Sequence, residues 1–420
     1  MLEQKEANKD RTSEGSFNDI HFRPIHPFPA RMAPSIALDS LMSCGQKPLR
    51  VLDPMTGSGT TCVVAKSLGH NVIGFDTDPL AVLIANAWCT EISKDNLLGK
   101  AADVLERATK RYEKLPLREA YPRDADVATR AFVKYWFDSC NRRQLASLAE
   151  TISRLHNPGL KTVLWCAFSR LIITKKIGVS LAMDISHSRP HRVYDNAPIK
   201  PFDKFLAAVE VVSRSLPFTE NKNSTSNTRI LLGDARKLPL KSRSIDIVVT
   251  SPPYLNAIDY IRGHKLSLIW MGYPLQDLRH IRSSNVGAEN SISQQTSKDY
   301  VDDILDEMGA VERLPERIRG MLLRYVSDMD SVLCEISRVL KIKGRAVLVI
   351  GDSTLKGTFI QNSKALTLLG KRHGLDLQSV VRRELQENRR YLPPPTAIGA
   401  GPQLRGRMRE EAIMTFCLCS

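Results

Sequence analysis

Apolar residues recur along two stretches of the chain in a pattern that predicts short strands joined by helices. Short apolar runs predict buried strands, and apolar residues spaced three or four apart predict the helices between them. In the first stretch, after a short helix over 35–42 capped by Ser35, we expect strand 49–53, helix 57–68, strand 71–76 and helix 80–89. Parallel strands with crossover helices form a doubly wound sheet, so the predicted fold class is α/β.

Strand-like runs return in the second half of the chain, after a long stretch in which helical spacing dominates. The later strands are expected at 229–232, 245–250, 345–350, 377–381 and 412–418. An inserted, mainly helical region therefore interrupts the sheet. We divide the chain into a polar N-terminal tail (1–20), a first half of the α/β domain (21–92), the helical region (93–227) and a second half of that domain (228–420).

Composition narrows the class of protein further. The 420 residues are 42% hydrophobic, and 60 Lys plus Arg against 45 Asp plus Glu leave a net charge of +15, which favours polyanions such as nucleic acid. Eight cysteines include no C-x-x-C pair and no histidine at zinc-ligand spacing, which predicts reduced core thiols in a cytoplasmic protein and no metal site. No apolar run approaches the ~20 residues of a spanning helix, so no membrane association is expected.

The turn after the first strand carries the chemistry of a ligand site. It combines an acidic residue, a proline, two glycines and two hydroxyl side chains: Asp53, Pro54, Gly57, Ser58, Gly59 and Thr60. Glycines let the backbone approach a ligand, and the following helix presents free N–H groups. Asp76 ends the second strand, where a carboxylate accepts both hydroxyls of a ribose. No Gly-Lys-Ser/Thr follows and Asp53 would repel phosphate, so a cationic nucleoside is favoured over a plain structural turn.

The strand at 245–250 runs directly into Ser251, Pro252, Pro253 and Tyr254. Two prolines end the strand ladder and hold the turn rigid. Such a turn leaves the Ser251 hydroxyl and a proline carbonyl free to accept hydrogen bonds, while the Tyr254 ring can stack on a planar group. The arrangement suits the exocyclic amine of a base, although a Pro-Pro pair taken alone marks only a turn.

Taken together, these segments resemble the S-adenosylmethionine-dependent DNA amino-methyltransferases. Residues 53–61 are similar to the cofactor motif of that family, Ser251 to Tyr254 to its catalytic motif, and 26–34 to the segment beside the methionine part of the cofactor. The resemblance implies a Rossmann-like methyltransferase sheet, with 21–92 as its cofactor-binding half and 228–420 as its catalytic half. The implied cofactor-binding residues are Phe28, Asp53, Pro54, Gly57, Ser58, Gly59, Thr60, Asp76 and Asp234.

The resemblance also implies a reaction. Ser251 and the Pro252 carbonyl would accept hydrogen bonds from the target amine, and Tyr254 would stack on the flipped base. Serine in the first motif position resembles the cytosine-N4 enzymes, so methylation of cytosine N4 is favoured; an adenine-N6 or RNA base methyltransferase is the alternative. C5 methylation is excluded because the chain has no Pro-Cys pair. A non-catalytic nucleic-acid-binding protein on the same scaffold is the alternative from another class.

Double-stranded DNA is the expected partner, in preference to RNA, and a restriction or defence subunit is a further candidate. The helical region 93–227 is the candidate for target recognition. The residues that we expect to contact nucleic acid are Arg189, His191, Arg192, Arg389 and Arg390. Basic runs of this kind supply phosphate and base contacts, although a plain solvated surface has the same composition.

Overall fold

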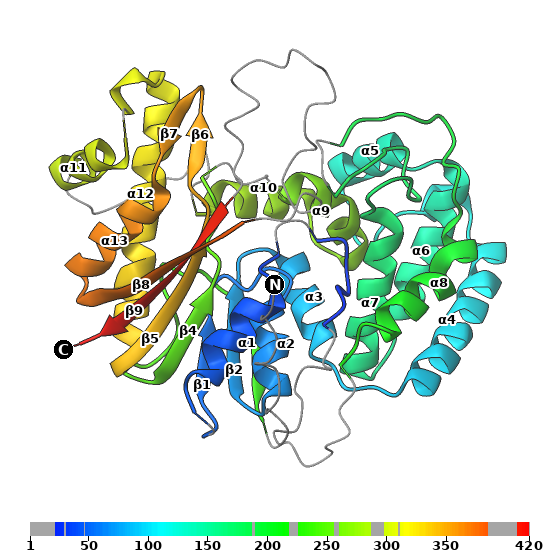
Figure 1. Ribbon diagram of the computed structural model, residues 1–420. Helices are drawn as coiled ribbons and strands as arrows, with labels where there is room; N and C mark the ends of the chain where they lie inside the picture. The colour runs from blue at the N-terminus through cyan, green and yellow to red at the C-terminus, as the bar shows by residue number, and fades with distance from the viewer. Residues whose placement is uncertain are drawn as a thin grey trace, which may run out of the picture.

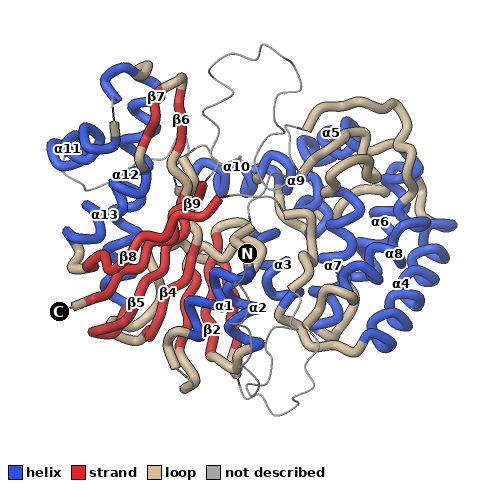
Figure 2. The backbone as a smooth tube through the Cα atoms, in the orientation of Figure 1, coloured by secondary structure: helices blue, strands red, loops and turns tan. Residues whose placement is uncertain are grey.

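The computed structural model describes residues 22–28, 31–45, 47–186, 190–217, 226–255, 260–286, 298–309, 311–384 and 410–419. Within these ranges seven strands form one twisted sheet in the order β3-β2-β1-β4-β5-β9-β8 (Figures 1 and 2). The strands are β1 Arg50–Asp53, β2 Asn71–Asp76, β3 Thr228–Leu232, β4 Ile245–Thr250, β5 Leu340–Ile350, β8 Leu375–Glu384 and β9 Glu410–Leu418. The first five in this order are parallel, and β9 runs antiparallel between β5 and β8.

Helices cover both faces of the sheet, and successive strand residues point to opposite faces. Val51 packs into the cluster formed with α1, α2 and α3, whereas Leu52 packs into the cluster formed with α11, α12 and α13. These helices are α1 Pro34–Met42, α2 Thr60–Ser67, α3 Pro79–Trp88, α11 Lys298–Met308, α12 Glu316–Val339 and α13 Asn362–Arg372. Because both faces are buried, the central strands are continuous apolar runs, which is why the sequence pattern located them.

The segment between β2 and β3 contains the predicted helices, which stand beside the sheet (Figure 1, cyan to green). They are α4 Lys94–Lys114, the 3₁₀ turn η2 Leu117–Glu119, α5 Val127–Trp136, α6 Ser139–Ser153, α7 Pro158–Ile172 and α8 Pro201–Ser213. Three of them begin at side-chain caps, because Asp126, Asp138 and Asn157 each accept a hydrogen bond from a backbone amide of the first turn. The Trp88 indole donates to the Ser215 carbonyl at 3.0 Å, which ties α3 to the end of α8.

Shorter elements complete the described chain. The helix α9 Ile261–Leu268, the turn η3 Ile269–Met271 and the helix α10 Leu275–Ser284 follow β4 and run between the sheet and the helical region (Figure 1). The turn η4 Val311–Arg313 precedes α12, and β6 Ser353–Leu355 pairs with β7 Thr358–Ile360 as a separate hairpin. No helix in the described ranges has both the length and the apolar character needed to cross a bilayer.

Two expectations require correction. The first helix begins at Pro34 with Ala33 as its N-cap, so Ser35 is not the cap; proline is pre-organised for the first helical position. All eight cysteines are free thiols, but they do not all lie in the core. Cys334 and Cys419 are exposed, because they lie on the solvent-facing side of α12 and beyond the end of β9.

Candidate functional site

The turn between β1 and α2 is built around two glycines in the left-handed region. Gly57 has φ +50° and Gly59 has φ +89°. A Cβ atom at Gly59 would lie 2.6 Å from the Ala85 Cβ, and one at Gly57 would lie 3.6 Å from the Phe28 ring. The backbone of the turn therefore runs against α3 on one side and faces the Phe28 ring on the other, which only glycine allows at Gly59.

Two carboxylates stand at the carboxyl ends of neighbouring strands beside this turn. Asp53 is buried and accepts from the Thr250 hydroxyl at 2.7 Å, and burial raises its pKa to about 6. Asp76 accepts from the Gly57 amide at 2.7 Å and from the Asp78 amide at 2.9 Å. Burial, followed by the charge of Asp78, raises the pKa of Asp76 to about 7. A nearby cation or hydroxyl donors would therefore stabilise the ionised form of both carboxylates.

Phe28 reaches the turn because the helical region holds the segment before it. His26 Nε2 lies 3.0 Å from the Ser169 hydroxyl, and Arg170 Nη1 donates to the Ile25 carbonyl at 2.8 Å. Burial, with Arg170 as the next cause, lowers the pKa of His26 well below its ordinary value, so this imidazole is neutral. Since Ser169 and Arg170 belong to α7, the inserted region also shapes the site at the sheet.

An aromatic cluster extends from Phe28 to α9. The Phe28 ring centre lies 5.2 Å from the His264 ring and 5.6 Å from the Tyr260 ring. His264 Nδ1 in turn lies 2.5 Å from the Asp78 carboxylate, which also caps α3. Three segments far apart in the sequence thus form one wall beside the glycine turn. His264 and Asp78 were not predicted as site residues, because neither belongs to a recognisable motif.

The Ser251 turn lies at the carboxyl end of β4, next to β1. Ser251 Oγ donates to the Val349 carbonyl of β5 at 3.0 Å, so its lone pairs remain able to accept. Pro252 is buried, and the Tyr254 hydroxyl lies 3.5 Å from the Glu411 carboxylate. The hydrogen bond from Thr250 to Asp53 joins the turn directly to the glycine-turn side of the site. The two halves predicted from distant parts of the sequence are therefore adjacent.

Comparisons with known proteins agree with this geometry. The family model described as DNA methylase, for the N6 and N4 enzymes, matches residues 4–87. Type II methyltransferase M.MvaI from Kocuria varians is 25% identical over 383 residues, which cover 83% of this chain and 81% of that protein. Type II methyltransferase M.BsoBI from Geobacillus stearothermophilus is 24% identical over 63% of this chain and 56% of its own length. The chain is therefore similar to the DNA amino-methyltransferases. It is a DNA methyltransferase, and its methyl donor is S-adenosylmethionine.

A solved methyltransferase dependent on S-adenosylmethionine, from Methanosarcina mazei, is 10% identical and covers 91% of this chain and 98% of its own, with a TM-score of 0.33. The donor set of this DNA methyltransferase suits the cofactor. A Cβ at Gly57 would reduce the space between the turn and the Phe28 ring. The carboxylates of Asp53 and Asp76 flank this space and suit a cationic ligand that carries hydroxyl groups. In the described ranges, His, Cys, Asp and Glu side chains form no group of three that could hold a metal ion.

Asp234 of the methyltransferase follows β3, at the same edge of the sheet as Asp76. The Gly233 amide donates to the Asp76 carbonyl at 3.0 Å, which joins the ends of β2 and β3. The Asp234 carboxylate pairs with the Arg236 guanidinium, with Nη2 at 2.7 Å, and Arg236 also reaches Asp328 of α12 at 2.7 Å. The pairing of Arg236 with Asp234 was not predicted, although Arg236 follows Asp234 by only two residues in the sequence.

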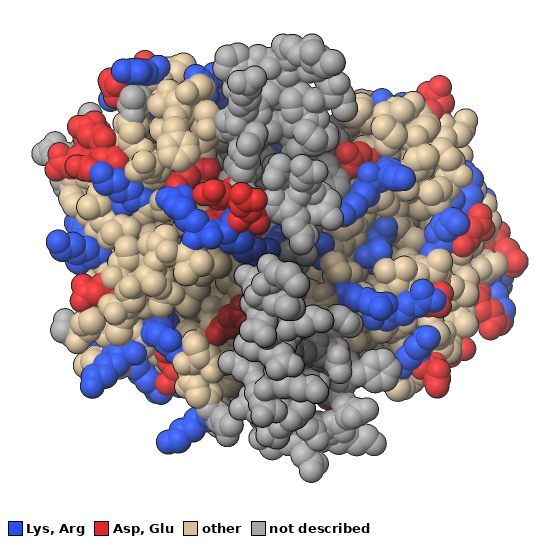
Figure 3. Space-filling view, in the orientation of Figure 1, with Lys and Arg blue, Asp and Glu red and all other residues tan. Residues whose placement is uncertain are grey.

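The expected nucleic-acid contacts are only partly within the described chain. Arg189, Arg389 and Arg390 lie outside the described residues. His191 and Arg192 are exposed, and Arg192 pairs with Asp195 at 3.1 Å and lies 6.0 Å from the Tyr135 ring. Figure 3 shows Lys and Arg interspersed with Asp and Glu over the visible face. The charge on that face therefore does not identify one surface as the nucleic-acid contact.

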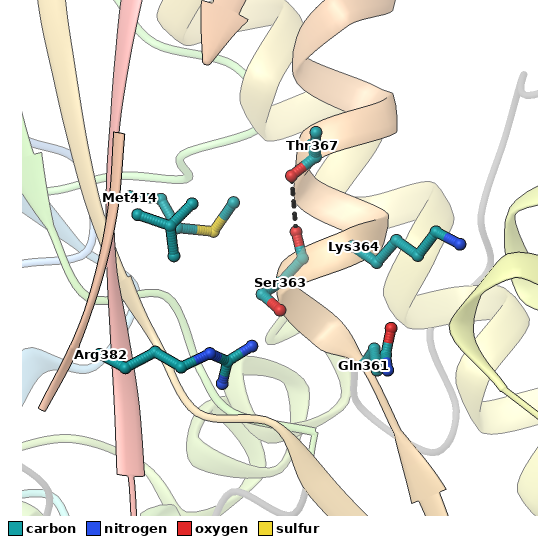
Figure 4. Close-up of a pocket in the computed structure, with 7 residues that line it drawn as sticks. Gln361, Ser363, Lys364, Thr367, Arg382 and Met414 are labelled. Atoms are coloured by element: carbon teal, nitrogen blue, oxygen red, sulfur yellow. Dashed lines mark hydrogen bonds between the residues drawn. The ribbon is translucent and has the colours of Figure 1, made fainter. Parts of the chain in front are cut away.

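A separate surface cavity of about 350 Å³ lies between α13 and β8 of the methyltransferase (Figure 4). Its lining residues are Gln361, Ser363, Lys364, Thr367, Val380, Arg382 and Met414. Its two cations have acidic partners, since Arg382 pairs with Asp352 at 3.2 Å and Lys364 pairs with Glu307. These acidic partners offset the positive charge of the cavity.

Proposed function

We propose that this DNA methyltransferase transfers its methyl group to the N4 amine of a cytosine flipped out of double-stranded DNA. The observation that carries the proposal is the Ser251 turn, whose hydroxyl donates to the Val349 carbonyl and so presents its lone pairs as acceptors. An exocyclic amine supplies the matching donors. The turn lies one strand from Asp53, which gives the amine a short path to a methyl group bound beside the glycine turn.

The cofactor supplies an electrophilic methyl group on a cationic sulfur when bound. In our proposal Asp53 and the turn with Pro54, Gly57, Ser58, Gly59 and Thr60 border the methionine part. Phe28 offers its ring face to the same part, since aromatic faces attract cations. Asp76 accepts the ribose hydroxyls, and Asp234 accepts the adenine amine in exchange for part of its hydrogen bonding to Arg236.

On the target side, Ser251 and the Pro252 carbonyl accept the two amine hydrogens and direct the nitrogen lone pair at the methyl group. Pro253 keeps the turn rigid, and Tyr254 stacks on the flipped base. Catalysis then comes from positioning and fixed dipoles. We further propose that the helical region 93–227 contacts DNA around the target through Arg189, His191 and Arg192. Arg389 and Arg390, in the second half of the α/β domain, are proposed as further phosphate or base contacts.

Mass spectrometry of nucleosides tests the proposal. Unmethylated genomic DNA and RNA are incubated separately with the protein and S-adenosylmethionine that carries a deuterated methyl group. We expect labelled N4-methylcytosine in DNA, and none with a Ser251→Ala control. Labelled N6-methyladenine, or label confined to RNA, would overturn the assignment of base or polymer. Cofactor binding without label in either polymer would support a non-catalytic nucleic-acid-binding protein.

Cofactor affinity should depend on pH through Asp76. With a pKa of about 7, this carboxyl is largely protonated below neutral pH, and ribose hydroxyls bind the ionised form better. The free protein thus holds more protons than the complex, so affinity rises with pH. Between pH 6.5 and pH 8 we expect the dissociation constant to fall about fourfold, as measured by calorimetry. Asp76→Asn should bind weakly and without this slope. A flat wild-type profile would contradict the role of Asp76.

Loosening the segment that carries Phe28 should weaken cofactor binding. Arg170→Met removes the hydrogen bond to the Ile25 carbonyl while keeping a long side chain. A hydrogen bond from a charged donor contributes about 1.5–3 kcal/mol, so we expect cofactor KM to rise about tenfold at nearly unchanged kcat. Arg154→Met is the matched control, because Arg154 is exposed and pairs only with Glu150 on its own helix in the contacts that the structure gives. Equal KM values for both variants would count against the anchoring role.

A further inference from the structure

Tyr325 of α12 carries a buried hydroxyl without a hydrogen-bond partner. The side chain is 2% exposed, and its hydroxyl has no donor or acceptor within reach in the described part of the chain. An unsatisfied buried hydroxyl is costly, and most buried polar groups in proteins are paired. Phenylalanine would fill the same space without this cost, so the hydroxyl of Tyr325 needs an explanation.

The register of α12 places Tyr325 at the carboxyl edge of the sheet. Asp328, three residues later on the same helix face, accepts from Arg236 at 2.7 Å. Arg236 in turn pairs with Asp234, directly after β3. Because parallel strands end at one edge, Tyr325 lies at the level where β1, β2, β3 and β4 present their site residues.

Tyr325 shares an apolar cluster with residues that follow Ser251. Tyr254 packs against the same apolar cluster that buries Tyr325 and Leu255. After burial, Tyr254 and Asp352 are the groups that raise the pKa of Tyr325, so the phenol stays protonated and can donate. Each of these neighbours has other partners.

Those other partners explain why Tyr325 is left unpaired. The Tyr254 hydroxyl lies 3.5 Å from Glu411. The Asp352 carboxylate, directly after β5, accepts from the Ser363 amide at 2.9 Å, from the Ser363 hydroxyl at 3.2 Å and from Arg382 at 3.2 Å. Within the described part of the chain, these neighbours therefore leave the Tyr325 phenol without an acceptor.

We propose that Tyr325 is a target-contacting residue, whose hydroxyl donates a hydrogen bond to a ring nitrogen or carbonyl oxygen of the base stacked on Tyr254. This inference rests on the proposed function, because it takes the flipped base to lie beside Tyr254. The base brings the acceptor that the free protein lacks, so the hydrogen bond forms only in the complex. A base with a hydrogen-bond donor at that position would place its donor against the Tyr325 hydroxyl, and it would bind poorly because neither donor finds an acceptor.

The variant Tyr325→Phe tests this proposal, because it removes only the hydroxyl. We expect an unchanged or higher thermal midpoint, a cofactor dissociation constant within twofold of wild type, and kcat/KM on unmethylated genomic DNA reduced tenfold or more. Tyr300→Phe is the matched control, since its ring contact with Arg372 at 4.1 Å survives the change, and it should behave as wild type.

The outcomes separate the two proposals. If the wild type forms labelled product and Tyr325→Phe retains its kcat/KM, the role of Tyr325 is wrong and the proposed function stands. If Tyr325→Phe loses cofactor binding or stability together with activity, the hydroxyl is structural and the target contact is also wrong. If the wild type forms no labelled base, both proposals fail together.

Discussion

Replacing Ser251 by alanine should reduce kcat for methyl transfer by at least about 100-fold, the loss typical of removing one preorganised hydrogen-bonding group at a reacting centre. The Ser251 hydroxyl donates to the Val349 carbonyl, which fixes the direction of its lone pairs. Alanine leaves the target amine with the Pro252 carbonyl alone, so the nitrogen lone pair is no longer aimed. Single-turnover transfer of a labelled methyl group to genomic DNA measures the loss.

Cofactor binding should survive this change, because in our proposal Ser251 lies on the target side of the site. Calorimetry with S-adenosylmethionine should give a dissociation constant within about twofold of wild type. A twofold change corresponds to less than about a tenth of the binding free energy of a tight complex. Ser331→Ala is the matched control: its hydroxyl donates within its own helix to the Ser327 carbonyl at 3.2 Å, and its activity should not change. If Ser251→Ala kept a tenth or more of wild-type kcat, the assigned role of the serine would be wrong.

Replacing Gly59 by alanine should destabilise the fold by about 3 kcal/mol or more. At φ +89° an L-residue is strained by about 1–2 kcal/mol. The new Cβ would also lie 2.6 Å from the Cβ and 2.8 Å from the Cα of Ala85. Backbone cannot move aside as a flexible side chain can, so α2 and α3 must separate, and overpacking of this kind costs about 1–3 kcal/mol. Urea unfolding followed by circular dichroism measures the loss.

Gly69→Ala separates strain from collision. Gly69 has φ +78°, but no atom lies within 4 Å of an added Cβ. Its substitution should therefore cost only the backbone strain, about 1–2 kcal/mol. Gly59→Ala should lose clearly more stability, and most of its cofactor affinity, since the helices that border the cofactor turn are displaced. Equal losses in the two variants would show that the close approach to α3 is unimportant.

The predicted strands were most accurate in the interior of the sheet. The strands β2 and β4 have the expected bounds, because their central residues are mainly apolar. The strand β5 begins at Leu340, before the apolar run at 345–350. Its first residues include the exposed Lys341 and Lys343, which lie in a register irregularity between the pairs Ile245–Leu340 and Ile247–Arg345. A hydrophobic pattern does not report a strand of that kind.

Part of the site follows from residues close together in the sequence. The glycine turn and the Ser251 turn were identified from local residue types, because left-handed backbone and ladder termination are decided within a few residues. The hydrogen bond between Thr250 and Asp53 was not predicted, since it depends on β1 and β4 being neighbours. Doubly wound sheets make this neighbourhood the natural expectation.

The fold class, the central strands and the two turns follow from residues close together in the chain, since periodicity and backbone restriction act over short distances. Which distant side chains meet follows only from the tertiary packing. It set Phe28 against His264, Arg236 against Asp234 and Asp328, and the unpaired hydroxyl of Tyr325 beside the Ser251 turn. These contacts depend on how whole helices pack on the sheet, and the residues involved are single polar or aromatic positions that leave no period in the sequence.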